Sequence, residues 1–378
     1  MKTFGLYIHI PFCVKKCAYC DFRSYENMME YRGAYIDALG RELSSYRGAL
    51  EGRSADTVYI GGGTPSALMP AQIIRLGEHI RKNVTLTPDA EFTIEANPDT
   101  GTSEIFLAAL AIGANRLSMG LQSADDDELR TLGRIHTAAQ FEKSFAAARD
   151  CGFKNISLDL MTGLPGQSAA SLFRSVDFAA GLNPEHISAY GLKIEEGTRF
   201  YKMRRELSLP DEDTEADMYL ALTERLSEYG YGQYEISNYA KRGFHSRHNM
   251  RYWLGGEYLG VGAAAHSYMD GRRFSNAPDI EGYISAVNAR GTAVTESVTL
   301  SRDDMLFEHI MLRLRTVRGI RHDEFSGEFG FDFSERFKGE IKKYTSSGHM
   351  LSDAAHTALT PKGFLISNSV ITDLLSQI

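Results

Sequence analysis

Three of the chain's four cysteines, Cys13, Cys17 and Cys20, lie close together in the stretch PFCVKKCAYCDF. Random placement of four cysteines would give a C-x3-C-x2-C pattern only about 4 × 10⁻⁴ times per chain of this length. Three core cysteines on one helix face would have the same spacing, but the proline before the run and the two lysines inside it disfavour a buried helix. The spacing therefore predicts a metal site.

The kind of metal follows from the number of thiols. Thiolates are soft ligands that select zinc, copper(I) or iron–sulfur clusters. A structural zinc site needs four ligands, normally as two pairs, and the remaining cysteine, Cys151, stands alone at the end of a helical pattern. We interpret it as a buried bystander. A [4Fe–4S] cluster held by three cysteines fits better and leaves one iron open to an exogenous ligand.

Short strand-like runs alternate with amphipathic segments over the first half of the chain. The strands are predicted at 5–10, 57–63, 91–97, 116–123, 155–163 and 186–194, and the helices at 27–47, 70–82, 102–112, 125–150 (with a break at Gly133) and 168–181. This alternation predicts βαβ units and a parallel sheet. The pattern alone leaves open whether the sheet is doubly wound or closes into a whole or partial barrel.

The character of the sequence changes after about residue 195. We predict a first domain over 1–210, a connecting segment over 211–300 and a third domain over 301–378. The connecting segment begins with a charged helix, and its aromatic, glycine-rich remainder is expected to form short strands and loops. The third domain opens with an apolar helical stripe and is predicted to be a small α+β unit of winged-helix type.

Composition excludes several classes of protein. The net charge is −8, from 41 basic and 49 acidic residues, and no basic tract of the kind that binds nucleic acid is present. The apolar run at the N-terminus is short and contains a histidine and a proline, so it predicts a buried strand rather than a signal peptide. No stretch has the roughly 18 consecutive apolar residues of a membrane span. We expect a cytoplasmic protein, whose clustered thiols stay reduced.

Polar residues recur where the predicted strands end. GGGTP at 61–65 ends the second strand, Glu95 the third, Gln122 the fourth and Asp159 the fifth, and Arg134 follows the fourth. Each alone could be a turn residue or a solvated strand end. Because the carboxyl ends of parallel strands share one edge of the sheet, together they predict one binding site there.

The C-x3-C-x2-C motif after a first strand, with Tyr19 beside its last cysteine, resembles the radical S-adenosylmethionine (SAM) superfamily. This resemblance implies an α/β fold, a partial (β/α)6 barrel with a smaller C-terminal α+β domain. It also implies that the amino and carboxylate groups of SAM bind the open iron, and that an electron from the cluster cleaves SAM to a 5′-deoxyadenosyl radical. The protein then has to bind, orient and shield the reactants.

The motifs YIHIPFC, GGGTP, IEANP, GLQS, DLMTGLPGQ and LRLRTVRGI are similar to those of the oxygen-independent coproporphyrinogen III oxidase family, over nearly the whole chain. The resemblance implies that Cys13, Cys17 and Cys20 hold the cluster. It also implies a set of residues that line the SAM sites: Tyr7, Tyr19, Gly62, Gly63, Thr64, Glu95, Gln122, Arg134, Asp159 and, as a weaker candidate, Lys193.

Two features distinguish this chain from the oxidases. Phe22 stands where the oxidases have a further cysteine, and Cys13 lies close to the start, whereas the oxidases have a long segment before the cluster. Both features resemble the haem chaperone (HemW) branch, which is not thought to oxidise coproporphyrinogen. That branch also has an H-N-x-x-Y-W motif, present here as HNMRYW at 248–253.

The HNMRYW motif suggests how haem could bind. His248 could ligate iron, and Tyr252 and Trp253 could offer flat faces to the macrocycle. The alternative is that His248 holds a loop by hydrogen bonds and the aromatic rings are core; His245 and His266 are weaker candidate ligands.

The resemblance implies a haem chaperone that binds a [4Fe–4S] cluster, SAM and haem. It would pass haem to acceptor proteins that could be membrane-associated. The alternatives are a radical SAM oxidative decarboxylase acting on coproporphyrinogen III and an electron-transfer iron–sulfur protein without SAM. Phe22 and the short N-terminus disfavour the decarboxylase, and the predicted SAM-lining set disfavours the electron-transfer protein.

Overall fold

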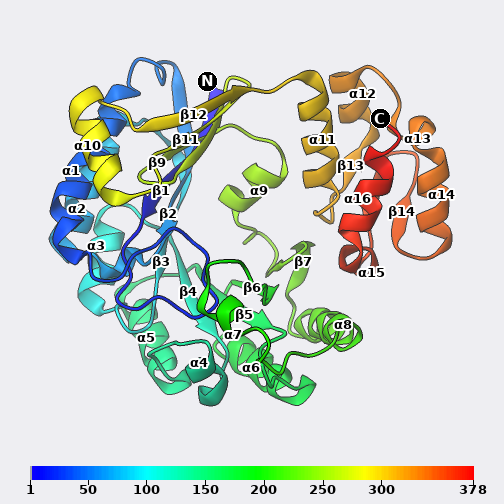
Figure 1. Cartoon of the computed structure of the whole chain (residues 1–378), viewed down its shortest axis with the longest axis horizontal. Helices are drawn as coiled ribbons and strands as arrows, with labels where there is room; N and C mark the ends of the chain where they lie inside the picture. The colour runs from blue at the N-terminus through cyan, green and yellow to red at the C-terminus, as the bar shows by residue number, and fades with distance from the viewer. Residues whose placement is uncertain (1) are drawn as a thin grey trace.

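The structure is a computed structural model that describes residues 2–378. Its main body is a twelve-stranded sheet in the order β12-β11-β10-β9-β1-β2-β3-β4-β5-β6-β8-β7, and a separate three-stranded sheet lies near the C-terminus (Figure 1). The two sheets have separate hydrophobic cores.

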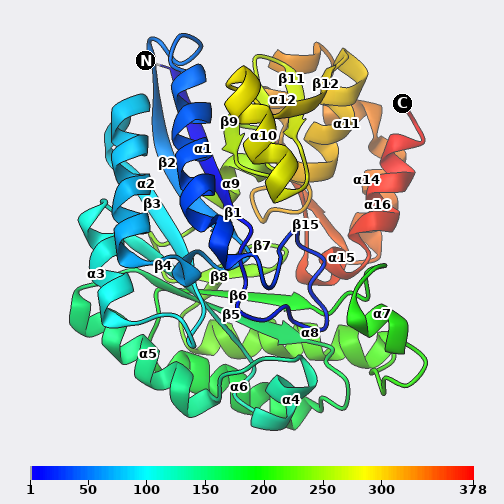
Figure 2. The same ribbon diagram turned by 60° about the vertical axis from the view of Figure 1, so that its left-hand side comes forward.

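Six parallel strands form the centre of the large sheet in sequence order: β1 (Lys2–Ile10), β2 (Arg53–Gly62), β3 (Leu86–Ala96), β4 (Arg116–Gln122), β5 (Ile156–Thr162) and β6 (His186–Gly191). The helices between them are η1 (Met29–Tyr31), α1 (Arg32–Ser45), η2 (Pro65–Ala67), α2 (Pro70–Asn83), α3 (Ser103–Ala111), α4 (Asp126–Thr131), α5 (Ala138–Cys151) and α6 (Ala169–Gly181). The longer helices cover the outer face of the sheet (Figure 2). The predicted partial (β/α)6 barrel is confirmed.

Local sequence signals set the helix boundaries. Thr102, Thr137 and Ser168 stand just before α3, α5 and α6, and each side chain accepts a hydrogen bond from the backbone N–H three residues later. Gly133, with a φ of 78°, lies in the break between α4 and α5. A residue with a side chain is strained at this φ, so glycine ends the helical run where the sequence predicted a break.

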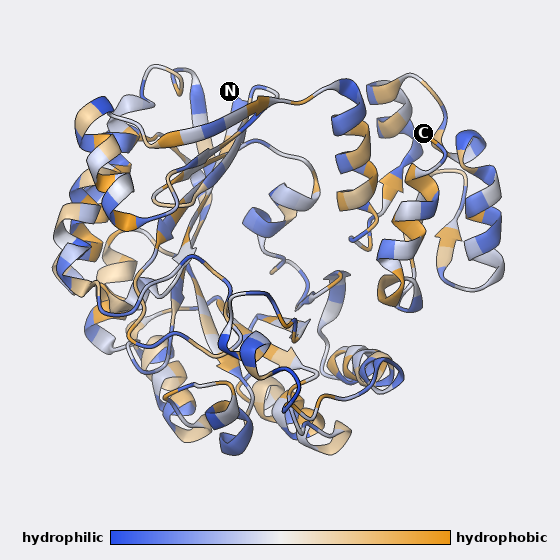
Figure 3. Ribbon diagram, viewed as in Figure 1, coloured by the Kyte–Doolittle hydropathy of each residue, from blue (hydrophilic) through white to orange (hydrophobic). Residues whose placement is uncertain are grey.

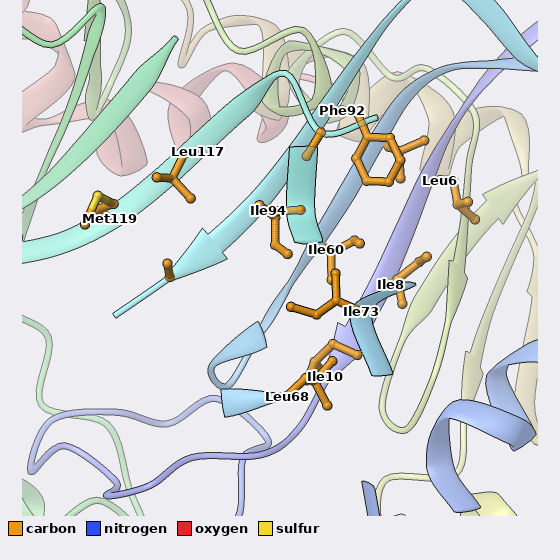
Figure 4. Packing of buried hydrophobic residues seen from close by; sticks show 14 of the residues in the cluster. Leu6, Ile8, Ile10, Ile60, Leu68, Ile73, Phe92, Ile94, Leu117 and Met119 are labelled. Atoms are coloured by element: carbon orange, nitrogen blue, oxygen red, sulfur yellow. The ribbon is translucent and has the colours of Figure 1, made fainter. Parts of the chain in front are cut away.

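The two faces of β1 have different roles. Leu6, Ile8 and Ile10 are fully buried and pack with neighbouring strands and with Ile73 of α2 (Figure 4). Burying each of these side chains contributes about 1.5–3 kcal/mol. Because successive side chains of a strand point to opposite faces, Tyr7 and His9 point to the inner side of the barrel.

The segment after β6 contains α7 (Arg199–Met203), α8 (Glu212–Glu228), β7 (Gly232–Glu235), β8 (Asn238–Ala240), α9 (Arg247–Trp253), β9 (Tyr258–Val261), β10 (His266–Met269), β11 (Arg272–Asn276), α10 (Ile280–Arg290) and β12 (Val294–Thr299). Strands β8 and β7 extend the sheet beyond β6, while β9–β12 extend it beyond β1. The segment expected to connect two domains therefore supplies both ends of the large sheet.

The C-terminal part is an α+β unit made of α11 (Arg302–Arg313), β13 (Ile320–Arg321), α12 (His322–Phe329), α13 (Phe333–Arg336), α14 (Lys338–Ser346), β14 (Met350–Ser352), β15 (His356–Leu359), α15 (Pro361–Leu365) and α16 (Ser367–Leu375). Phenylalanines of α12 and α13 fill its core. Hydrophobic residues concentrate in the barrel strands and on inward helix faces (Figure 3). Within residues 2–378, no helix is both long and apolar enough to span a bilayer.

Candidate functional site

The loop that follows β1 carries the three clustered cysteines across the inner side of the barrel, as the dark blue trace at the centre of both overall views (Figures 1 and 2). Backbone hydrogen bonds fix it at the first cysteine and directly after the second: Cys13 N–H donates to Tyr25 O (3.1 Å) and Ala18 N–H donates to Leu132 O (2.9 Å). All three cysteines line one cavity of about 430 Å³, which we call the cluster cavity.

The thiols of the loop have polar neighbours that suit a metal cluster. Thr64 Oγ1 donates to Cys13 Sγ over 3.5 Å, and Arg134 Nη1 donates to Cys17 Sγ over 3.4 Å. Burial raises the pKa of the Cys13 thiol and raises that of Cys20 to about 11. Burial therefore favours the neutral form of both thiols, and a bound metal would favour their thiolates.

The arrangement of the thiols bears on the kind of metal. Nowhere in residues 2–378 do three or more His, Cys, Asp or Glu side chains form the ligand set of a single metal ion. Three thiols that line one cavity are the ligand set expected for a [4Fe–4S] cluster. A Cβ on Gly63 would lie 3.1 Å from Cys13 Sγ and 2.8 Å from Phe12 O, so glycine is needed at this wall. Cys151 does not line the cluster cavity; its thiol lies 3.7 Å from Ser103 O.

The cluster cavity also brings together most of the residues expected to line the SAM sites. It contains Tyr19, Gly62, Gly63, Thr64, Glu95, Gln122, Arg134, Asp159 and Lys193. They come from the carboxyl ends of consecutive strands and the loops that follow, except Asp159, which lies in the middle of β5 and not at its end as the sequence predicted. Tyr7 and His248 do not line this cavity.

Two residues at strand ends have unusual backbone conformations. Gly62 has a φ of 114°, and its N–H donates to Glu95 Oε2 over 3.1 Å. Gln122 has a φ of 69°, which is uncommon for a residue with a side chain, and its Oε1 accepts a hydrogen bond from Tyr190 OH over 3.0 Å. Such conformations cluster at binding sites, where the surrounding structure imposes them.

The charged groups of the cavity are of both signs. Burial and the neighbouring Glu95 raise the pKa of Asp159 to about 7, and burial raises that of Glu95. Burial opposes the charge of Arg134, but the nearby Cys17 and Tyr19 leave its pKa raised, so it is a fixed cation. A cavity with acceptors at one wall and a cation at another suits a ligand that has both ammonium and carboxylate groups.

Asn97 is a site residue that the sequence analysis missed. Its Nδ2 donates to Thr64 Oγ1 over 3.0 Å, and its Oδ1 accepts from Arg134 Nη2 over 2.8 Å. It therefore joins the two residues that donate to cysteine sulfurs. The available signal was its place directly after the third strand, in the IEANP motif.

A second cavity of about 420 Å³ adjoins the cluster cavity. The two share Asp21 and Phe22 of the cysteine loop, together with Gly62 and Glu95. Its other lining residues are Tyr7, His9, Arg23, Tyr252, Tyr258, Ala264 and His266. We call it the aromatic cavity, because most of these side chains carry rings. Tyr7, expected in a SAM site, lies here.

His248 is held by hydrogen bonds, as in the second of the two interpretations of HNMRYW. Its side chain is buried, with Nδ1 hydrogen-bonded to Thr57 Oγ1 (2.9 Å) and Nε2 to Tyr252 OH (2.8 Å). Burial lowers its pKa to about 3, so the ring is neutral. Both ring nitrogens are occupied, and His248 lines neither cavity. Of the two aromatic residues in HNMRYW, Tyr252 lines the aromatic cavity and Trp253 lines neither.

Comparisons with known proteins agree with this architecture. The radical SAM superfamily model matches residues 7–179, and the HemN C-terminal domain model matches residues 300–366. The fold is similar to that of coproporphyrinogen III oxidase (HemN) from Escherichia coli, described as a radical SAM enzyme, with a TM-score of 0.87. That likeness covers 100% of this chain and 91% of the other at 24% identity, so it concerns the fold.

Curated relatives match the chain from end to end. The chain is 36% identical to heme chaperone HemW of Bacillus subtilis, over 98% of this chain and 99% of the relative. It is 34% identical to heme chaperone HemW of Escherichia coli, over 100% of this chain and 99% of the relative. The chain therefore belongs to the HemW family of radical SAM proteins.

Proposed function

We propose that this protein is a haem chaperone that holds a [4Fe–4S] cluster, SAM and haem and delivers haem to acceptor proteins. The observation that carries the proposal is the end-to-end similarity to curated heme chaperones at 34–36% identity. The aromatic cavity beside the cluster cavity supports it, because a flat macrocycle needs ring faces to pack on.

The residues of the cluster cavity divide into two roles in this proposal. Cys13, Cys17 and Cys20 would hold the cluster, and a bound cluster with SAM supplies one-electron chemistry at the sulfonium group. Glu95 and Asp159 would accept hydrogen bonds from the polar groups of SAM, while Arg134 orients its carboxylate. Gly62 and Gly63 let the ligand approach the backbone closely.

An oxygen-independent coproporphyrinogen III oxidase is the second candidate, and the fold of HemN favours it. Phe22 weighs against it: the side chain is 65% exposed in the cysteine loop, at the position where the sequence resemblance places a cysteine in the oxidases. An exposed phenyl ring offers an apolar contact surface and no metal ligand.

The two candidates differ in what they do to a porphyrin. The full-length protein would be reconstituted anaerobically and given coproporphyrinogen III with SAM and a reductant, and separately one equivalent of haem. We expect no decarboxylated product and one haem per chain, which then transfers to apomyoglobin, used as a haem sink, faster than from haem–albumin. Decarboxylated product, or no haem binding, would refute the chaperone proposal.

We place the protein in the cytoplasm, where free thiols remain reduced, and expect its acceptors to include membrane-associated haem proteins. Delivery to such acceptors requires contact with the acceptor rather than with lipid. Flotation with acceptor-free liposomes of anionic and neutral lipids should therefore leave the protein in the unbound fraction. Co-flotation with acceptor-free liposomes would contradict this placement.

A further inference from the structure

We propose that haem binds in the aromatic cavity with His266 as an axial ligand of its iron and Arg23 as the partner of a propionate. This inference rests on the proposed function and gives the haem iron a ligand outside HNMRYW, while Tyr252 of that motif forms part of the cavity wall. It also assigns that motif's histidine a different role, that of a positioning residue for Tyr252.

His266 is the histidine of this cavity whose ring is free. Its side chain is exposed at the start of β10, and its ring nitrogens form no hydrogen bond with another residue of the described chain, 2–378. The other histidine of the cavity is engaged: His9 Nε2 donates to Arg23 O (2.8 Å) and its Nδ1 accepts from Tyr7 OH (2.9 Å). An iron ligand must present a ring nitrogen that no other group occupies, and His266 lines the cavity without such a partner in the described chain.

The turn before His266 is held in a strained shape. Ala264 lines the cavity with a φ of 58°, a conformation unfavourable for a residue with a side chain. A Cβ on Gly260 would lie 2.1 Å from His266 O, so the chain folds back on itself closely at this point. The buried carboxylate of Glu42 accepts from Gly262 N–H (2.9 Å) and from Asn276 Nδ2 (2.7 Å). This anchored turn fixes the position of His266, and such strain is found where a site must be preorganised.

The walls of the cavity suit a flat macrocycle. Tyr252 and Tyr258 pack edge to face, with ring centroids 4.6 Å apart at 90°. Phe22 lines the same cavity, and its side chain is largely exposed. Together these rings give the apolar contact surface that binds most of a porphyrin.

Charge at the cavity completes the match to haem. Arg23 lines the cavity, and its guanidinium pairs with no carboxylate among residues 2–378. Haem carries two propionate carboxylates, and an unpaired arginine beside an aromatic wall can bind one of them through two parallel hydrogen bonds. The cavity thus offers a nitrogen ligand, ring faces and a cation.

His248 supports this site without touching the ligand. Its Nε2 is hydrogen-bonded to Tyr252 OH, and its Nδ1 is hydrogen-bonded to Thr57 of β2. The histidine therefore ties the ring of Tyr252 to the barrel wall. Loss of His248 should loosen one wall of the cavity without changing the iron's ligands.

The test uses full-length, cluster-reconstituted protein and the absorption and electron paramagnetic resonance spectra of bound ferric haem. His266→Ala should weaken haem binding about tenfold or more and change the spectrum from that of a histidine ligand, and added imidazole should restore it. His248→Ala should weaken binding about threefold and keep the wild-type spectrum. His245→Ala is the matched control: this exposed histidine stacks on Tyr234 away from both cavities and should bind haem as the wild type does.

The propionate contact has a separate readout. Arg23→Gln should weaken binding of haem about fivefold while leaving binding of haem dimethyl ester, which has no carboxylates, unchanged. This variant keeps the proposal testable if His266→Ala is poorly folded, as judged by its circular dichroism and cluster content.

The outcomes separate the site from the function. A wild-type protein that binds no haem refutes the chaperone proposal itself. A wild type that binds haem, with His266→Ala unchanged in affinity and spectrum, overturns only the assignment of His266. If the spectrum of His248→Ala shifts and imidazole restores it, His248 rather than His266 is the iron ligand. If Arg23→Gln weakens binding of haem and of its dimethyl ester equally, Arg23 does not contact a propionate.

Discussion

The cluster cavity and the aromatic cavity share a wall but are assembled differently. The cluster cavity is lined mainly by carboxyl ends of consecutive parallel strands and by the loops after them, with side chains of both charges. The aromatic cavity joins β1 and the cysteine loop to residues from α9, β9 and β10, more than 220 positions later in the chain, and most of its side chains carry rings.

This difference shows which part of the structure carries which task. The barrel itself supplies the residues proposed to hold the cluster and SAM, because a parallel sheet gathers its strand ends at one edge. The segment after β8 supplies the second cavity, because β9 pairs with β1 and brings Tyr258 and the turn before His266 to the inner wall. The choice of a second ligand thus depends on contacts far apart in the sequence.

The two cavities should respond most differently when a ligand of the cluster is removed. Cys17→Ala should abolish the visible absorption of the reconstituted cluster, because no other thiol in the cavity can replace the missing one. Haem affinity should stay within about threefold of the wild type, since Cys17 does not line the aromatic cavity.

Cys151→Ala is the matched control for this experiment, because its thiol lies outside the cluster cavity. It should keep full cluster absorption. A Cys17→Ala variant with an unchanged spectrum would contradict the ligand assignment, and loss of haem binding together with the cluster would show that the cavities act as one.

A substitution at the shared wall should affect both cavities. Gly62 has a φ of 114°, and a Cβ there would lie 2.5 Å from the ring of His9. Gly62→Ala should therefore weaken SAM and haem binding about tenfold each, measured by equilibrium dialysis and by spectral titration. Gly230→Ala is the control, because its φ of 84° imposes similar backbone strain in open space. Unchanged affinity for both ligands would show that the shared wall has no role.

The anchor of the aromatic cavity's turn should matter for stability. Glu42 accepts hydrogen bonds from Gly262, Asn276 and Tyr283, the last over 2.5 Å. Glu42→Gln leaves at least one of these buried donors without an acceptor, so it should lower the free energy of unfolding by about 2 kcal/mol at pH 7. Haem affinity should fall with it, while cluster absorption is retained. Glu51→Gln, at an exposed position, is the control.

The difference in the free energy of unfolding between the wild type and Glu42→Gln should also depend on pH. Burial raises the pKa of the Glu42 carboxyl from 4.5 to about 7 in the folded chain. The folded state then binds a proton more tightly than the unfolded state. The contribution of the Glu42 carboxyl to the free energy of unfolding is therefore full below about pH 4.5 and declines as pH rises toward 7. Wild-type stability relative to Glu42→Gln should decrease over that window in urea titrations, by at most about 1.4 kcal/mol per pH unit. If the relative stability of the wild type instead increased over this window, the pKa of Glu42 would be lowered on folding and not raised.

The smallest effect is expected at the rim of the cluster cavity. Lys193 lines it with an exposed side chain, where a charge pair is screened by water and salt. Lys193→Ala should weaken SAM binding about threefold, or about 0.7 kcal/mol, and the effect should shrink at high salt. Lys202→Ala, an exposed lysine on α7, should have no effect. A tenfold loss would make Lys193 a principal SAM contact.

The sequence predicted the cluster cavity far better than the aromatic one. The strands that carry Glu95, Gln122 and Asp159 could be recognised from their period, and parallel pairing then brings those residues together without further information. The alternation predicted a parallel sheet, and the resemblance to radical SAM proteins implied the partial barrel, which is confirmed. Asn97 was missed because its role depends on contacts to Thr64 and Arg134, which lie 33 and 37 positions away.

The aromatic cavity could not be assembled from the sequence. The segment from β7 to β10 lacks a clean hydrophobic period, so the pairing of its strand β9 with β1 could not be predicted from the sequence. The prediction for His248 rested on a motif, and a motif does not tell whether a ring nitrogen faces a cavity or the barrel wall. Its burial against Thr57 and Tyr252 is a tertiary property.

The central claim is that one chain holds SAM and haem at the same time in two adjoining cavities. Its most direct test is a haem titration of the cluster-reconstituted protein, with bound SAM measured by equilibrium dialysis at each step. We predict one haem and one SAM per chain at saturation, and a dissociation constant for haem that changes less than about threefold when SAM is present. Release of one SAM for each haem bound would contradict the claim, because it would place both ligands in one cavity.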